Sequence, residues 1–136
     1  MRDFVKRGGV LVAPSLTRGL DLPDDLCRVV IIIKAPFPYL GDPQVNKRLH
    51  RDQGGSLWYD IQTAREVAQM TGRAVRHDTD WAVTYILDAT FVKNIWRRRK
   101  SLFPKYIRDA VMLASALQVL NAELELPTPN KVRQTV

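Results

Sequence analysis

The sequence predicts an α/β fold in which helices flank a parallel β-sheet. The run Arg28–Lys34 is a continuous β-branched stretch without alternation, which is typical of a strand covered on both faces. Helical patterns separate this run from a second β-branched and aromatic stretch, Trp81–Leu87. Strands that alternate with helices in this way belong to parallel sheets.

The remaining elements follow from apolar patterns and their end signals. A short apolar run at Gly9–Ala13, ended by Pro14, predicts a further buried strand. Asp42 predicts a helix N-cap with Pro43 at the first helical position, and the pair at 54–55 breaks that helix. Its buried side carries Val45 and Leu49.

Two longer helices are expected in the second half of the chain. Ser56 is expected to cap the first, which ends at Gly72. Its predicted apolar face consists of Leu57, Ile61, Ala64, Ala68 and Thr71. The second begins near Pro104, and its predicted stripe consists of Ile107, Val111, Ala114, Leu117, Leu120 and Leu124. Residues 1–126 are therefore expected to form one domain portion, with a disordered tail or linker at 127–136.

Composition favours an intracellular protein with a polyanionic partner. The 21 basic and 14 acidic residues give a net charge of +7, which favours nucleic acid through counterion release, although charge alone does not separate DNA from RNA. Charge also does not separate nucleic acid from an anionic membrane, but no basic amphipathic helix with a bulky apolar face stands out, so no membrane partner is expected. No apolar run approaches the span of a bilayer. The lone Cys27 suits a reducing cytoplasmic setting, and we expect it to act as a small buried hydrophobe.

The segment Gln69-Met-Thr-Gly-Arg-Ala-Val-Arg76 carries the clearest chemical signal. Its two arginines lie three apart, just after a predicted helix end, and can direct two guanidinium groups at the terminal phosphate of a nucleotide. Such fixed positive donors stabilise the charge that develops in phosphoryl transfer. By itself the pattern also fits a solvated basic face.

Two further pieces stand upstream of this segment. They are Ser15-Leu-Thr-Arg-Gly-Leu-Asp21 and the strand that ends in Lys34-Ala-Pro-Phe-Pro38. In their order and spacing, the three pieces resemble motif V, the strand and turn that follow it, and motif VI of the superfamily 2 DNA helicases. The closest resemblance is to the iron-sulfur helicase group that includes DinG and XPD, and it covers roughly residues 8 to 108. It implies a truncated RecA-like domain, a partial helicase domain of the P-loop NTPase type that holds only the last strands.

The resemblance also implies roles for the residues of the two motifs. Arg76 matches the arginine finger, Arg73 the arginine close to the γ-phosphate, and Gln69 and Gly72 the nucleotide-binding positions beside them. In the upstream motif, the residues that match the coupling loop between nucleotide and DNA are Gly19 and Asp21. The expected contacts with DNA phosphates come from Ser15, Thr17 and Arg18.

The sequence lacks a phosphate-cradling loop, an Asp-Glu-x-His box and the cysteines of an iron-sulfur cluster. The resemblance therefore implies that ATP and Mg²⁺ are held mainly by a missing N-terminal helicase half, and that this chain holds no iron-sulfur cluster. The implied function is the C-terminal portion of an ATP-dependent DNA helicase that moves along single-stranded DNA. A non-catalytic binding module and an inactive remnant remain open as alternatives.

Three further features are ambiguous. The run Trp96, Arg97, Arg98, Arg99, Lys100 fits a single-strand path with a stacking tryptophan, and equally a solvated basic face with the tryptophan in the core. His77 and Asp78 favour a solvated turn over a metal site. Relatives commonly have a glycine near Trp81 and an arginine in place of Thr90, so we expect a different loop geometry and a lost ion pair here.

Overall fold

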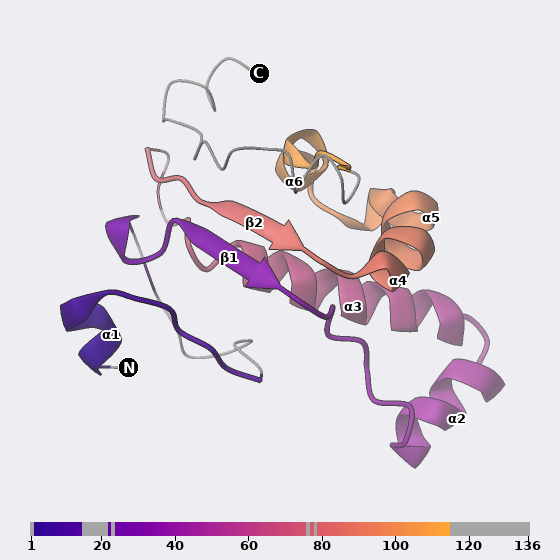
Figure 1. Ribbon diagram of the computed structural model, residues 1–136. Helices are drawn as coiled ribbons and strands as arrows, with labels where there is room; N and C mark the ends of the chain where they lie inside the picture. The colour runs from indigo at the N-terminus through magenta and orange to yellow at the C-terminus, as the bar shows by residue number, and fades with distance from the viewer. Residues whose placement is uncertain (1, 15–21, 23, 76, 78, 115–136) are drawn as a thin grey trace.

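The computed structural model describes residues 2–14, 22, 24–75, 77 and 79–114 (Figure 1). In chain order the elements are α1 (Arg2–Arg7), η1 (Asp24–Leu26), β1 (Val29–Ile32), α2 (Pro43–Arg51), α3 (Gly55–Thr71), β2 (Val83–Ile86), α4 (Ala89–Phe91), η2 (Val92–Trp96), α5 (Arg97–Arg99), η3 (Lys100–Leu102) and α6 (Lys105–Ala110). The short elements η1 and η3 are 3₁₀ helices, and η2 is a π-helical turn.

The two strands pair in parallel, as the sequence predicts. Val29 lies opposite Val83 and Ile32 opposite Ile86, and backbone hydrogen bonds extend the pairing at both ends. The connection between the strands contains α2 and α3, and α3 runs along the sheet (Figure 1). This is a small α/β unit with a two-stranded parallel sheet and helices, so the predicted fold class is confirmed.

The expectation that β1 is covered on both faces is wrong for the described residues. Ile32 is buried, whereas Val29, Ile31 and Ile33 are exposed. The core cluster formed by α3 and the elements after β2 lies against Ile86 of β2, and among the described residues no layer covers the exposed face of β1. A continuous β-branched run predicts a strand but does not show how many layers surround it.

The strand expected at Gly9–Ala13 is absent from the described structure. Gly8 and Gly9 adopt positive φ angles of 70° and 112°, which turn the chain after α1. Val10 and Val12 then remain 89% and 83% exposed. Their side chains favour a strand, but they have no paired neighbour, and without pairing the propensity alone does not form one.

The start of α2 agrees with its sequence signal. The Asp42 side chain accepts a hydrogen bond from the Gln44 backbone N–H at 2.8 Å, and Pro43 occupies the first helical position. The side chains of Val45 and Leu49, which the sequence predicts to be buried, are half-buried.

The two glycines break the helical path as expected, but the cap of α3 differs from the prediction. Gly54, at a φ of 78°, is the N-cap, and Ser56 lies inside the helix. A Cβ atom at Gly55 would overlap the carbonyl oxygen of Arg48, so this glycine permits the close approach of α2 and α3. Because Gly54 adopts the left-handed conformation, the helix begins at Gly55, and Ser56 is already inside it.

Helix α3 ends at Gly72, as predicted, and the Gly72 N–H donates to the Ala68 carbonyl at 3.1 Å. Its buried face differs from the expected one, because Leu57 is 42% exposed whereas Thr63 and Val67 are buried. The predicted stripe is therefore rotated about the helix axis relative to the observed face.

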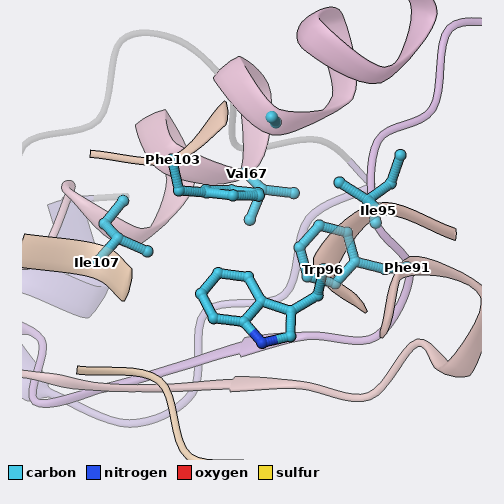
Figure 2. Packing of buried hydrophobic residues seen from close by; sticks show 8 residues of the cluster. Val67, Phe91, Ile95, Trp96, Phe103 and Ile107 are labelled. Carbon is cyan, nitrogen blue, oxygen red and sulfur yellow. The ribbon is translucent and has the colours of Figure 1, made fainter. Parts of the chain in front are cut away.

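The core lies between α3 and the helical segment that follows β2 (Figure 2). Phe103 anchors it, with ring centroids 6.0 Å from Phe91 and 5.3 Å from Trp96. The buried members of the cluster are Ala35, Ala64, Val67, Phe91, Ile95, Trp96, Phe103 and Ile107.

The last predicted helix begins where expected but is shorter. Pro104 is the N-cap of α6, which ends at Ala110. Val111 and Ala114 are exposed and lie outside the helix. The expected stripe beyond residue 114 and the tail at 127–136 fall outside the described residues.

Candidate functional site

The predicted nucleotide-facing residues lie at the end of α3 and on the turn that leads to β2. Gln69 is exposed on the last turns of the helix, and Gly72 is its C-cap. Arg73 follows, half-buried, and its backbone N–H donates to the Met70 carbonyl at 3.3 Å. The placement of this arginine between helix and strand is therefore the one expected from the sequence.

An open hollow of about 370 Å³ lies between α3 and the start of α6. Gln69 and Arg65 provide its polar groups. The other lining residues are Ile61, Ala64, Ala68, Leu102, Pro104 and Tyr106. Gln69 thus has an open space beside it.

Arg76, the expected arginine finger, lies outside the described residues. So do all the expected coupling-loop and DNA-contacting residues of the upstream motif, namely Ser15, Thr17, Arg18, Gly19 and Asp21. The roles of these residues stay predictions.

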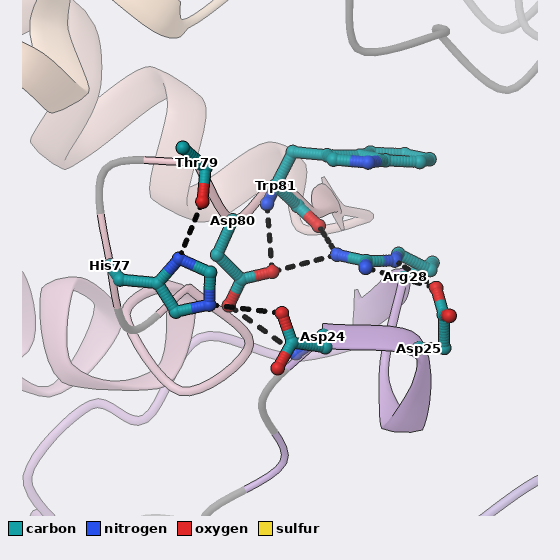
Figure 3. A network of polar contacts seen from close by, with 7 residues as sticks. All are labelled: Asp24, Asp25, Arg28, His77, Thr79, Asp80 and Trp81. Carbon is teal, nitrogen blue, oxygen red and sulfur yellow. Dashed lines mark hydrogen bonds and ion pairs between the residues drawn. The ribbon is translucent and has the colours of Figure 1, made fainter.

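Arg28 is the centre of a polar network that sequence reasoning missed (Figure 3). Its Nη1 atom donates to the Asp80 carboxylate and to the Trp81 carbonyl, each at 2.7 Å. Its Nε and Nη2 atoms donate to Asp25 at 3.0 and 2.9 Å. The guanidinium also lies 4.9 Å from the centroid of the Trp81 ring, within range of a cation–π interaction.

This network joins the segment after the first motif to the segment after the second. Burial would lower the pKa of Arg28, but its hydrogen bonds with Asp80 and Asp25 outweigh that effect and raise the pKa. The Asp80 side chain is fully shielded from solvent, and the Arg28 guanidinium supplies a positive charge directly against it. Trp81, which stands near the glycine position of the relatives, supplies both a carbonyl and a ring to the same arginine.

His77 extends the network. Its Nε2 atom lies 2.9 Å from the Asp24 carboxylate, and its Nδ1 atom lies 2.9 Å from the Thr79 hydroxyl. Asp24, His77 and Asp80 each offer one atom that could bind a metal ion, and these three atoms lie within 4.8 Å of one another. His77 therefore has acidic neighbours that the sequence did not indicate. Asp80 already binds the Arg28 guanidinium, whose charge opposes a metal cation, and we assign no metal to this cluster.

Asp88 joins the ends of the two strands. One carboxylate oxygen accepts from the backbone N–H groups of Thr90 and Phe91 at 2.8 and 3.3 Å, and the other accepts from Ala35 at 3.0 Å. Burial would raise the pKa of Asp88, but these three backbone donors outweigh it and lower the pKa. An aspartate directly before a helix is a capping signal that sequence reasoning had available and did not use.

The basic run is divided between a structural contact and an exposed face. Trp96 is buried against Phe103, so the structure shows the core alternative for this tryptophan. The Arg99 Nε atom donates to Asp60 on α3 at 3.2 Å. The side chains of the run that remain exposed are those of Arg97, Arg98 and Lys100.

The arrangement is a small α/β unit with an arginine, Arg73, on the turn from its long helix into its second strand. The helicase C-terminal domain family matches residues 2–110, and the chain belongs to this family. Its resemblance to the iron-sulfur DNA helicase group is confirmed, and the chain is homologous to the C-terminal part of ATP-dependent DNA helicases.

Curated relatives agree with this family. A Fanconi anemia group J protein homolog of Gallus gallus is 37% identical to this chain, over 88% of the chain and 11% of the relative. The ATP-dependent DNA helicase chl-1 of Caenorhabditis elegans is 31% identical, over 70% of the chain and 12% of the relative. A regulator of telomere elongation helicase 1 homolog of Drosophila grimshawi is 36% identical, over 57% of the chain and 9% of the relative.

The chain thus spans about a tenth of the length of these relatives. No solved structure matches it. Within the described ranges, each helix is too short or too polar to cross a bilayer.

Proposed function

We propose that the chain supplies the arginine-bearing part of an ATP-dependent DNA helicase. Joined to the half that holds the nucleotide, it couples ATP hydrolysis to movement along single-stranded DNA. The observation that carries this proposal is the position of Arg73 on the turn between α3 and β2, in a chain of the helicase C-terminal domain family.

The chemistry proposed for the turn is electrostatic. Arg76 acts as the arginine finger, and Arg73 and Gln69 offer hydrogen-bond donors that suit the oxygens of a terminal phosphate. These donor types fit the phosphates of ATP, whereas the carboxylate that holds Mg²⁺ is assigned to the other half. When bound there, Mg²⁺ would supply charge neutralisation for the phosphates of ATP.

The Arg28 network supports this role by fixing the end of the same turn. Asp80 and Trp81 follow Arg76 closely in the chain, and both are held by Arg28, which directly precedes β1. A turn anchored at this end loses less conformational entropy when it meets a nucleotide. Arg28 is therefore proposed as a positioning residue.

A second candidate function is a nucleic-acid-binding module without hydrolysis. The net charge of +7 and the exposed side chains of Arg97, Arg98 and Lys100 favour it. Both functions predict weak binding to a single strand. They differ in whether Arg76 affects turnover.

The first test measures phosphate release by the purified chain with single-stranded DNA and Mg²⁺. We expect no turnover above that of an Arg76→Ala variant, because an arginine finger acts only on a nucleotide that is already held. Turnover that disappears in the variant would show a complete active site in this chain and contradict the assignment of ATP to another half.

The second test uses the complete helicase. Arg76→Ala should reduce turnover by about 10³ while nucleotide affinity changes by no more than a few fold, as is typical of an arginine finger. Arg76→Lys should restore little, because an ammonium does not bridge two oxygens. Equal losses of affinity and turnover would make Arg76 a ground-state binding residue, and unchanged turnover would favour the non-catalytic module.

A further inference from the structure

The turn after β1 carries an exposed aromatic side chain. Tyr39 is 78% exposed, and its backbone carbonyl accepts a hydrogen bond from the Asp42 N–H at 3.1 Å. A Cβ atom at Gly41 would overlap the Tyr39 ring, so the ring packs directly on the glycine backbone. The turn therefore holds an aromatic ring in place while leaving most of it in solvent.

The neighbouring aromatic side chains already have partners. Tyr59 stacks on Phe37, with ring centroids 6.0 Å apart, and donates its hydroxyl to the Pro38 carbonyl at 3.0 Å. Trp58 is covered by the Arg48 guanidinium, 4.4 Å from its ring centroid. Compared with these aromatic side chains, the Tyr39 ring has more of its surface open to a ligand.

Two cations of α2 lie beside the same turn. Lys47 and Arg51, one helical turn apart, line a hollow of about 470 Å³ together with Leu40, Gly41, Pro43 and Asn46. Both cations are exposed, and neither forms an ion pair with an acidic side chain within the described residues. Their charge is therefore available to a polyanion, unlike that of Arg99, which pairs with Asp60.

We propose that this turn and α2 form a contact site for single-stranded nucleic acid, in which a base stacks on Tyr39 and phosphates lie against Lys47 and Arg51. An aromatic ring beside unpaired cations is the combination that binds single strands without sequence readout. The inference rests on the proposed function, which supplies the nucleic-acid partner. It also provides a stacking ring where Trp96, the ring suggested by the sequence, is buried.

The test measures the affinity of the purified chain for a fluorescent oligothymidine by anisotropy, at several salt concentrations. Tyr39→Ala should weaken binding by about 5- to 150-fold, whereas Tyr39→Phe should bind as the parent does. On a strand with abasic sites in place of the bases, Tyr39→Ala and the parent should bind alike. This second strand separates stacking from any loss of folding in the variant.

The cations are tested by a double variant, Lys47→Gln with Arg51→Gln. It should flatten the log–log salt slope by about 1.4, since each phosphate neutralised on a single strand contributes about 0.7. The matched control is Lys6→Gln with Arg7→Gln, which changes the net charge equally on α1, at the opposite end of the molecule (Figure 1). The control should leave the slope unchanged.

The outcomes separate this inference from the proposed function. A parent chain that binds no single strand would overturn this site and weaken the DNA-coupling function together. A parent that binds, with Tyr39→Ala and the α2 variant indistinguishable from it, would overturn this site alone and leave the contact to the run at Arg97 and Arg98 or to Ser15, Thr17 and Arg18. Equal losses in the α1 and α2 variants would show a general charge effect and would also overturn the site.

Discussion

Replacing Asp88 by alanine should destabilise the chain more than any other loss of a helix cap among the described residues. The change removes the cap of α4, which typically costs about 1 kcal/mol. It also leaves the N–H of the buried Ala35 without its carboxylate acceptor, which costs about 1–3 kcal/mol. The expected loss is therefore about 2–4 kcal/mol in the free energy of unfolding, measured by urea titration with tryptophan fluorescence.

The matched control is Asp42→Ala. Asp42 also caps a helix, but it is exposed and its one capping bond goes to the exposed N–H of Gln44, so its loss should cost about 1 kcal/mol. The difference between the two variants measures the bond to Ala35 together with the second capping bond of Asp88, which Asp42 lacks. Equal losses would refute the argument that the link between the strand ends contributes beyond capping.

The dependence on pH provides a second check of the same residue. The folded-state pKa of Asp88 lies below its ordinary value of 3.8, so the carboxylate contributes stability that is present above about pH 4. That contribution is lost as the pH falls through the folded-state pKa. The stability difference between the parent and Asp88→Ala should therefore shrink below pH 4, and a constant difference would contradict the assignment.

Three other variants test the network, the core and the basic run. Arg28→Met removes a cation that binds the shielded Asp80 carboxylate and should lower the urea midpoint more than Asp25→Ala, which removes the exposed partner; equal shifts would contradict the importance of the buried contact. Trp96→Ala should cost about 3–5 kcal/mol because it empties part of the core, and Trp96→Phe should cost less; a neutral Trp96→Ala would place the indole outside the core. Arg97→Gln with Arg98→Gln should flatten the salt slope of strand binding by about 1.4, and an unchanged slope would show these residues to be a solvated face.

Local signals in the sequence predicted those elements whose ends are set by residues close by in the chain. The β-branched runs form both strands, Asp42 and Pro43 start α2, and Gly72 ends α3. In each case the favourable backbone geometry is set within a few residues. The run Gly9–Ala13 shows the limit of such reasoning, because a strand also needs a partner that the local sequence does not specify.

The polar contacts that shape the site were not predictable in this way. Arg28 and Asp80 lie 52 residues apart, and Ala35 and Asp88 lie 53 apart. Such pairs form only when the parallel sheet brings the strand ends together. The helical pattern that ends at Gly72 placed Arg73 correctly before β2, but local patterns gave no information on Tyr39, whose exposure depends on the turn at Gly41.

The π-helical turn η2 determines which way the side chains of the basic run after it face, because it fits more residues into one turn than an α-helix does. Phe91 and Trp96 are five apart, and the wide turn returns both to the core side (Figure 2). In a regular α-helix, each residue advances about 100° around the axis. At that advance, the five steps from Phe91 to Trp96 would turn Trp96 about 140° away from the face of Phe91. A regular α-helix of the same length would therefore direct Arg97 and Arg98 toward a different side of this surface, with every arginine retained.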